Sequence, residues 1–302
     1  MSNPQLAQII DSALLKRAHL LTSENNLARL IDGAGDGLPG VYLETMGGHW
    51  LISTKLVQLS QELKSLLRDR SPGSLYWKRL DQHQKDSPTH LGGEETTEFF
   101  TGIENGLKCR LSFDSGYSQG IFLDQRVNRR RVKELMTPGK TLLNTFSYTG
   151  FFSIAAGAAG ATTSTLDLSQ VYLDWARENF RLNEMDPGEH YFCKGDTFHW
   201  LKRFGKQGRK FDAIVLDPPT FSRDDKGKVF RVERDYPDLF GLALACLAPG
   251  GSILACHNYR GMTAREFQSQ LRDCAPTAKI ESAAMPEDFT EEQYLKSVWV
   301  NL

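Results

Sequence analysis

The feature that most limits the possible folds is a regular alternation of strands and helices that begins at Lys140. Apolar stretches rich in β-branched residues alternate with longer stretches of helical period, and few residues separate them. The expected strands are 140–146, 162–168, 189–195, 210–217 and 251–257, and the expected helices are 149–160, 169–185, 197–206 and 235–248. This alternation predicts a doubly wound α/β domain, in which a parallel sheet carries helices on both faces.

The end of the chain departs from the alternation. A helix is expected at 263–275, and two strands, 279–285 and 297–302, follow with only a short polar segment between them. Strands so close in sequence pair most easily as an antiparallel hairpin at the sheet edge. A mostly parallel sheet with such an edge is typical of class I, Rossmann-like methyltransferases rather than dehydrogenases.

The first hundred residues follow a different plan. Behind an N-terminal helix, residues 28–56 read as three strands joined by glycine-rich turns, and 60–70 as a short amphipathic helix. In 99–113 the sequence Glu-Asn-Gly is typical of a hairpin turn between two strands. We therefore expect a small α/β domain over 1–115 and a methyltransferase-type domain over 116–302.

Composition restricts the class of protein. With 302 residues, 40% of them hydrophobic, the chain can bury a substantial core. It has no apolar stretch long enough to cross a membrane and no secretory signal, so we expect a cytoplasmic protein. Its five cysteines show neither metal-ligand nor disulfide spacing, so we expect reduced thiols and no bound metal.

Charge gives less guidance. The net charge of −1 does not support a nucleic-acid partner through bulk electrostatics. Between Asp124 and Lys140, however, six basic residues accompany two acidic ones. The commoner interpretation of such a run is a solvated helix face.

In an open α/β sheet the ligand lies beyond the carboxyl ends of the strands. Asp167 follows Asn144 by 23 residues, which suits a carboxylate that accepts from both ribose hydroxyls of a nucleoside. Ser169 is the better cap for the next helix, which leaves Asp167 available. Asp196 could accept a hydrogen bond from the adenine amino group or serve as the N-cap of the helix at 197–206, and the sequence favours the two roles about equally.

The sequence of the turn after the first strand distinguishes between two kinds of cofactor, a dinucleotide and S-adenosylmethionine. A dinucleotide needs several glycines so that backbone amides can approach its pyrophosphate, and Phe-Ser-Tyr-Thr-Gly contains one. S-adenosylmethionine carries no phosphate, so this turn can hold it. A nicotinamide dehydrogenase would also need an acid-base histidine, and His257 is more typical of a polar residue at a strand end.

Six motifs resemble the bacterial 23S ribosomal RNA methyltransferases of the RlmI and RlmK type, and they lie at 36–50, 118–132, 142–161, 165–183, 216–225 and 255–261. The resemblance runs from about residue 29 to the end. It implies S-adenosylmethionine as cofactor and ribosomal RNA as partner, with no membrane or metal, in a monomer or homodimer. We expect no counterpart in this sequence of the PUA domain of RlmI-like members or of the second methyltransferase fused to some RlmK members.

The resemblance also assigns roles to residues. The cofactor side would comprise Phe122, Asp124, Gln125 and Arg126 over the methionine end, Asn144, Phe146, Ser147, Tyr148 and Gly150 along the turn, Asp167 and Leu168 at the ribose, Asp196 and Thr197 at the adenine, and Asp217 beside the methyl group. The basic run after Arg126 would meet RNA phosphates through one face, with salt-dependent affinity.

Two chemistries occur in this family. Methylation of cytosine C5 requires a thiolate in the pocket, and cytosine-type members resemble one another in a Ser-Cys-Ser-Gly where this chain has Asn258, Tyr259, Arg260 and Gly261. Cys256 precedes that place by on the order of 10 Å of extended chain. We expect it to pack as a small buried hydrophobe.

Guanine N7 needs no covalent adduct and no general base, only in-line placement and exclusion of water. Asn258, Arg260 and Gly261 match the guanine-type motif, so the sequence is closer to the RlmK type. Arg260 suits either the O6 and N7 edge of guanine or a phosphate.

The sequence Val-Leu-Asp-Pro-Pro-Thr-Phe supplies the other wall of the target pocket. Asp217 would accept from an exocyclic amine or from the cofactor, while Pro218 and Pro219 fix the neighbouring carbonyls. Thr220 and Phe221 would complete the wall, with Phe221 stacking on a flipped base. We thus expect a guanine-N7 methyltransferase of large-subunit ribosomal RNA; the alternatives are a cytosine-C5 enzyme and a non-catalytic RNA-binding module.

Overall fold

The computed structural model describes residues 3–83, 85–116, 118–223, 227 and 229–302. Asp224 and Asp225, at the end of one family motif, lie outside these ranges. The chain divides into two compact units: Met1–Arg126 with Pro286–Glu292, and Val127–Met285 with Gln293–Leu302.

The second unit is built on a seven-stranded sheet of order β10-β9-β8-β11-β14-β16-β15. Its strands are β8 (Thr141–Thr145), β9 (Thr162–Asp167), β10 (Tyr191–Lys194), β11 (Phe211–Leu216), β14 (Leu247–His257), β15 (Lys279–Ala283) and β16 (Lys296–Asn301). The first five run parallel, and β16 pairs antiparallel with both β14 and β15. The expected doubly wound sheet with an antiparallel edge is confirmed.

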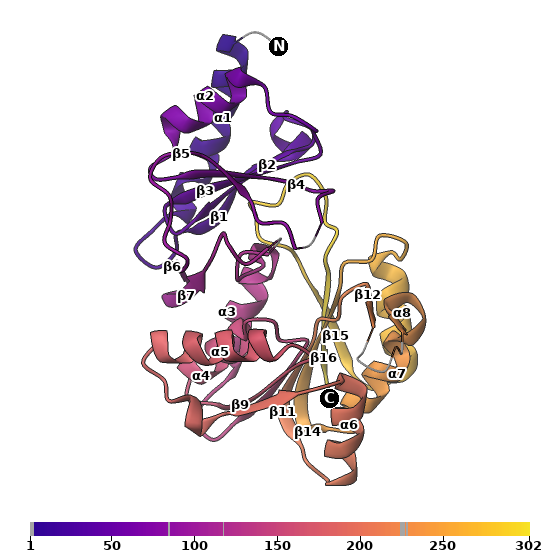
Figure 1. Cartoon of the computed structure of the whole chain (residues 1–302). Coiled ribbons are helices and arrows are strands. Elements are labelled where there is room, and N and C mark those ends of the chain that lie inside the picture. The colour runs from indigo at the N-terminus through magenta and orange to yellow at the C-terminus, as the bar shows by residue number, and fades with distance from the viewer. Residues whose placement is uncertain (1–2, 84, 117, 224–226, 228) are drawn as a thin grey trace. The chain divides into compact units, whose positions relative to one another are not determined.

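Helices cover both faces of this sheet, with α4 and α5 on one side and α6, α7 and α8 on the other (Figure 1). The helical segments are α3 (Arg126–Leu135), α4 (Phe151–Ala158), α5 (Gln170–Leu182), η4 (Pro187–Glu189), α6 (Thr197–Lys206), α7 (Val232–Leu244) and α8 (Ala264–Cys274). Strand residues such as Ile214 and Ile253 pack with Phe204 and Phe240 of the helices in one buried cluster. That cluster fixes the sheet whose carboxyl edge carries the site.

The sequence did not predict one small element of this unit. Just after the Asp-Pro-Pro turn, β12 (Phe221–Arg223) and β13 (Val229–Arg231) form an antiparallel pair. Each strand is only three residues long, too short for a clear pattern of alternation.

The first unit carries a five-stranded sheet of order β1-β2-β3-β4-β5 and a separate hairpin, β6-β7. Its elements are α1 (Asn3–Arg17), η1 (Ala18–Leu20), β1 (Leu27–Asp32), η2 (Gly33–Asp36), β2 (Val41–Met46), β3 (His49–Thr54), α2 (Gln61–Arg70), β4 (Leu75–Arg79), β5 (Thr89–Gly92), β6 (Phe100–Glu104), β7 (Leu107–Leu111) and η3 (Leu123–Gln125). Asn105 and Gly106 have φ of 51° and 77°, as a tight hairpin turn requires. The predicted turn is therefore confirmed.

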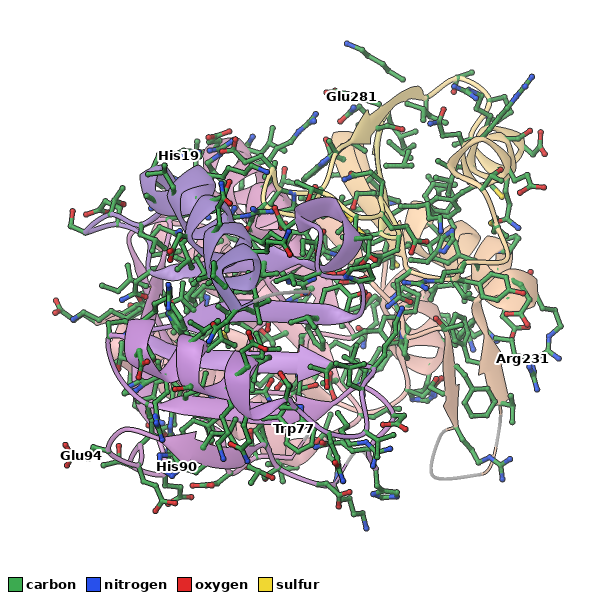
Figure 2. The ribbon with its side chains drawn as sticks, turned by 90° about the horizontal axis from the view of Figure 1, so that it is seen from above. His19, Trp77, His90, Glu94, Arg231 and Glu281 are labelled. Carbon is green, nitrogen blue, oxygen red and sulfur yellow. The ribbon has the colours of Figure 1, made fainter. Side chains whose placement is uncertain are left out.

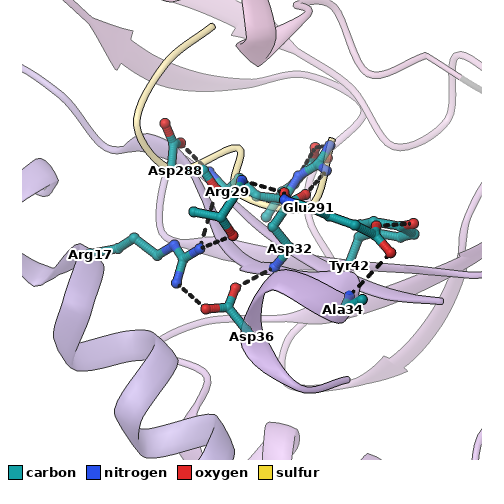
Figure 3. Close-up of polar contacts among 10 residues, drawn as sticks. Arg17, Arg29, Asp32, Ala34, Asp36, Tyr42, Asp288 and Glu291 are labelled. Atoms are coloured by element: carbon teal, nitrogen blue, oxygen red, sulfur yellow. Dashed lines mark hydrogen bonds and ion pairs between the residues drawn. The ribbon is translucent and has the colours of Figure 1, made fainter. Parts of the chain in front are cut away.

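The first unit also includes the segment Pro286–Glu292, which a network of buried ionic and backbone contacts holds in place (Figure 3). The Asp288 carboxylate accepts from the Arg126 guanidinium at 2.5 Å and from the Arg29 backbone N–H at 2.8 Å. Asp32 Oδ2 accepts from the backbone N–H of Thr290 at 2.6 Å and of Glu291 at 2.7 Å.

These contacts explain why the compact units divide at Arg126 rather than near the expected boundary at residue 115. The Arg126 guanidinium donates to the Leu27 carbonyl at 3.1 Å as well as to Asp288, so its side chain belongs to the first unit. Residue spacing alone does not reveal a partner 162 positions away.

Candidate active site

The turn from β8 into α4 has an unusual backbone. Phe146 and Tyr148 have φ of 51° and 50°, in the left-handed region that non-glycine residues rarely occupy. The conformation is held by β9, because the Ser147 N–H donates to the Leu166 carbonyl at 3.0 Å and the Tyr148 N–H to Asp167 Oδ2 at 2.9 Å. Backbone strain of this kind tends to occur at ligand-binding sites.

The single glycine of the turn serves helix packing. Gly150 has φ of 78°, and a Cβ added there would lie 2.7 Å from the Cβ of Ala176 on α5. Asn144 also joins β8 to α4, because its buried side-chain amide donates to Ser153 Oγ at 3.1 Å. Neither contact tests the predicted cofactor role of these two residues, which remains a prediction.

Ser147 has a buried hydroxyl without a partner. The residue is 8% exposed, and its Oγ makes no hydrogen bond to any described residue. Buried hydroxyls nearly always have a hydrogen-bond partner. A polar ligand bound at this turn would supply the missing one, so the residues present fit the predicted cofactor.

Asp167 ends β9 with both carboxylate oxygens turned to backbone amides. Oδ2 accepts from Tyr148 N–H, and Oδ1 accepts from Ser169 N–H at 2.8 Å. Burial raises the pKa of the Asp167 carboxyl above its ordinary value, while hydrogen bonds from the amides of Ser169, Tyr148 and Leu168 oppose that rise. Each oxygen keeps a lone pair that can accept from a ribose hydroxyl.

Ser169 caps α5, as predicted, by accepting from the Tyr172 N–H at 3.4 Å. The Tyr172 ring meets the Tyr148 ring edge-on at 4.6 Å between centroids. Burial, followed by the charge of Asp167, raises the pKa of the Tyr172 hydroxyl. Two aromatic rings and a carboxylate thus share the edge of the sheet where a nucleoside is expected.

Asp196 follows β10 and caps α6, since its Oδ1 accepts from the His199 N–H at 2.9 Å. Thr197 is buried in the first turn of that helix. The capping interpretation of Asp196 is therefore confirmed. Its second carboxylate oxygen leaves room for the adenine contact, which stays a prediction.

Thr220 and Asn258 bring the two halves of the predicted target pocket together. The Thr220 hydroxyl donates to Asn258 Oδ1 at 2.8 Å, which joins the turn after β11 to the turn after β14. The Thr220 carbonyl accepts from the Val232 N–H at 3.1 Å, which fixes the turn to the start of α7. Within the turn, Pro218 is buried, Asp217 is half-buried and Pro219 is exposed.

Phe221 begins β12 with its side chain 50% exposed. The Arg231 guanidinium, on β13 across the pair, lies 5.5 Å from the ring centroid (Figure 2). An exposed ring beside the Asp-Pro-Pro turn suits the predicted stacking role, which remains untested.

The turn after β14 is shaped by contacts that local sequence does not suggest. Lys296, on β16, donates to the Tyr259 carbonyl at 2.9 Å. A Cβ on Gly261 would lie 2.4 Å from the Tyr259 ring, so a side chain there would require the ring to move. The Arg260 guanidinium lies 6.0 Å from the Tyr294 ring centroid. Lys296 was not among the predicted site residues, because its contact depends on the antiparallel pairing of β14 and β16.

Cys256 and His257 are buried within β14. The Cys256 thiol lies 3.5 Å from Ser297 Oγ on the neighbouring strand, which confirms the expected role as a small buried side chain. The His257 ring packs edge-on against Phe267 at 4.3 Å. Burial, assisted by the charge of Lys296, lowers the pKa of His257 to about 4, so its ring is neutral near pH 7.

The basic run of 124–140 makes several internal contacts, and its contact with RNA phosphates remains a prediction. Arg129 is buried with its guanidinium 5.7 Å from the rings of Phe151 and Phe152. Arg131 pairs with Glu281 on β15 at 2.9 Å, and Lys140 donates to the Leu135 carbonyl at 3.0 Å.

Phe122, Asp124, Gln125 and Arg126 belong to the first unit, unlike the residues above. Phe122 is 53% exposed, whereas Gln125 and Arg126 are buried. Their predicted closure over the methionine end of the cofactor remains a prediction.

Comparison with known proteins identifies the class. The family model for S-adenosylmethionine-dependent methyltransferases matches residues 75–292. The chain belongs to this family. Membership confirms the predicted methyltransferase class and S-adenosylmethionine as the cofactor. Among solved structures, the methyltransferase fold is matched by that of SMU.776 complexed with SAH, with a TM-score of 0.91 and 29% identity over 100% of this chain and 82% of that one.

Curated relatives in the methyltransferase family support the resemblance seen in the motifs. Ribosomal RNA large subunit methyltransferase K of Neisseria meningitidis is 36% identical over 77% of this chain and 62% of its own length. Ribosomal RNA large subunit methyltransferase I of Aeromonas salmonicida is 35% identical over 82% and 64%. The chain thus spans less than two thirds of either relative.

The described residues of this methyltransferase include neither a membrane-spanning helix nor a cluster of metal-binding side chains. Every helix within them is too short or too polar to cross a membrane. They contain no group of three or more histidine, cysteine, aspartate or glutamate side chains that could hold a metal ion.

Proposed function

We propose that this protein transfers a methyl group from S-adenosylmethionine to N7 of a guanine in 23S ribosomal RNA. The RNA substrate is supported by the two relatives named as large-subunit ribosomal RNA methyltransferases. We further propose that it acts in the cytoplasm, as a monomer or homodimer. In this proposal the first unit either binds RNA or braces the second.

The observation that carries the choice of atom is the makeup of the joined turns after β11 and β14. Thr220 and Asn258 hold these turns together, and Arg260 and Gly261 complete the guanine-type motif. The nearest candidate thiol, Cys256, is fully buried within the sheet. A cytosine-C5 reaction needs a thiolate that reaches the ring carbon beside the target.

The similarity of whole sequences does not make this choice. The relative of the K type is 36% identical and that of the I type 35%, a difference too small to favour either. Residues at the turns after β11 and β14 are more informative, because in this proposal they would touch the target base. They favour N7, whose lone pair needs no covalent adduct.

In this proposal each residue of the site has a separate role. When bound, S-adenosylmethionine supplies an electrophilic methyl group on a sulfonium. The Asp167 carboxylate would accept from the ribose hydroxyls, and Ser147 Oγ would contact the methionine end. Asp217 would accept from the amino group of the base, and the Phe221 ring would stack on it. Orientation of this kind can lower a barrier by several kcal/mol without proton transfer.

The test is methyl transfer in vitro, with nucleosides identified by mass spectrometry. Purified protein, labelled S-adenosylmethionine and unmodified 23S ribosomal RNA should yield labelled 7-methylguanosine. Cys256→Ala should retain at least half of the rate, because the thiol is buried against Ser297. Labelled 5-methylcytidine, or covalent trapping on RNA that contains 5-fluorocytosine, would instead establish the C5 reaction.

A further inference from the structure

A cationic stripe runs along the exposed face of α6. His199, Lys202, Arg203 and Lys206 follow the spacing i, i+3, i+4 and i+7, and all four are exposed. Leu201 and Phe204, on the opposite face, pack in the buried cluster of the second unit. The helix therefore presents one apolar face to the sheet and one basic face to solvent.

The stripe differs from the other charged helical surfaces of the chain. α6 contains no acidic residue, whereas α1, α2, α3, α5, α7 and α8 each contain at least one. On α5, for example, Arg177 pairs with Asp174 at 2.7 Å, and Arg181 pairs with Glu178. Lys202, Arg203 and Lys206 form no ion pair with any residue that the structure describes. Their charges are thus left for an external anion.

Aromatic side chains accompany these cations. The Arg203 guanidinium lies 5.0 Å from the Trp200 ring, and the Arg209 guanidinium 4.9 Å from the ring of Tyr191. Tyr191 lies on β10, at the edge of the sheet, with 55% of its surface exposed. In β10 it alternates to the same face as Cys193, which packs with Leu201 and Phe204 of α6. Tyr191 and α6 therefore lie on the same side of the sheet.

We infer that α6 and Tyr191 form a binding surface for single-stranded RNA, with the cations contacting phosphates and the tyrosine ring stacking on a base. A basic groove or stripe beside exposed aromatic rings is the usual arrangement for such binding. Residues 191–210 contain six basic residues and one acidic residue in a chain of net charge −1. This local excess is complementary to a phosphate backbone. The inference rests on the proposed RNA substrate and adds the surface that holds it.

The phosphate contacts can be tested through salt dependence. The double variant Lys202→Gln, Lys206→Gln should bind a labelled oligouridylate roughly 10-fold more weakly near 0.1 M salt. The slope of log affinity against log salt should become shallower by about 1.4, or about 0.7 for each lost contact. The control is Arg272→Gln, Lys279→Gln, which removes the same charge from exposed positions on α8 and β15. It should leave the slope unchanged.

The stacking part has a separate readout. Tyr191→Ser should weaken binding about fivefold without changing the salt slope, because stacking does not depend on released counterions. Both variants should bind SAH like the wild type, measured by calorimetry, which also shows that they fold.

Two other outcomes are distinguishable. If the α6 variant keeps the slope of the wild type while the wild type methylates ribosomal RNA, the proposed surface is wrong and the proposed function stands. If the wild type neither binds nor methylates RNA, the proposed function is wrong, and the proposed RNA-binding surface is wrong with it.

Discussion

The Thr220 hydroxyl donates a 2.8 Å hydrogen bond to Asn258 Oδ1, and this contact links turns that lie 38 residues apart in the sequence. It forms because β11 and β14 are parallel neighbours, with Leu216 beside Ala255 at their carboxyl ends. The two motifs therefore lie side by side, as the proposed single target pocket requires.

Removing this hydrogen bond should slow catalysis with little effect on cofactor binding. Thr220→Val and Asn258→Ala should each lower kcat/KM about 5- to 10-fold, since a neutral hydrogen bond contributes about 1 kcal/mol. The double variant should be no slower than the slower single variant, which a double-mutant cycle of methyl-transfer rates will show. Thr141→Val is the control. It removes a hydrogen bond to Asp212 at the start of β8, away from the two turns, and should leave kcat/KM unchanged. Strictly additive losses at positions 220 and 258 would contradict the coupling.

Asp167 should control affinity for the cofactor. Asp167→Asn should weaken SAH binding by about 10- to 100-fold, the range for a lost hydrogen bond to a charged group. Calorimetry measures the effect, and Asp174→Asn, on the exposed face of α5, is the matched control. Equal affinities for the wild type and Asp167→Asn would contradict the proposed ribose contact.

The same carboxylate predicts a dependence of cofactor binding on pH. Because burial raises the pKa of Asp167, the group takes up a proton at a higher pH than an ordinary aspartate as the solution is acidified. A protonated carboxyl accepts less well from two hydroxyls. SAH affinity should therefore fall with decreasing pH in the wild type, and the fall should be absent in Asp167→Asn.

His257 should make stability dependent on pH. Its pKa is about 4 in the folded chain and 6.5 ordinarily, so the unfolded chain binds the proton more tightly. Stability is then complete above pH 6.5 and is lost as pH falls towards 4. Between pH 6.5 and 5 the loss from this group should be about 2 kcal/mol. Urea unfolding of the wild type and His257→Gln will measure it, and equal slopes with pH would contradict the assignment.

Asp288 should contribute strongly to the stability of the first unit. Asp288→Ala leaves the buried Arg126 guanidinium without its carboxylate partner and should cost about 3 to 5 kcal/mol of unfolding free energy. Glu281→Ala breaks the more exposed pair with Arg131 and should cost less than about 1 kcal/mol. Urea unfolding curves compare the two, and similar losses would show that burial of the Arg126 pair has little effect.

Local pattern was sufficient to predict the second unit because its strands and helices are long and their order is regular. It also identified Ser169 as the cap of α5, since capping depends on neighbouring residues. The same pattern failed for β12 and β13, which are too short to show a period. It also did not reveal how the basic run is paired. Arg131 finds its partner, Glu281, 150 residues later, and sequence spacing does not reveal such pairs.

The segment Pro286–Glu292 shows the same limit. Nothing in its composition indicates that it joins the first unit, because the contact with Arg126 depends on the folded path of the chain. The α6 stripe was not among the sequence predictions, although its helical spacing can be read from the sequence. It became informative only when the structure showed which of its cations lack acidic partners.

The most direct test of the central claim is a comparison of ribosomal RNA from a strain that lacks this gene with RNA from its parent. Reduction and aniline cleavage detect 7-methylguanosine at single positions, and nucleoside mass spectrometry detects 5-methylcytidine. We expect one 7-methylguanosine position in 23S RNA to disappear and to return when the gene is restored. If every such position is retained while a 5-methylcytidine is lost, the assignment to guanine N7 is wrong.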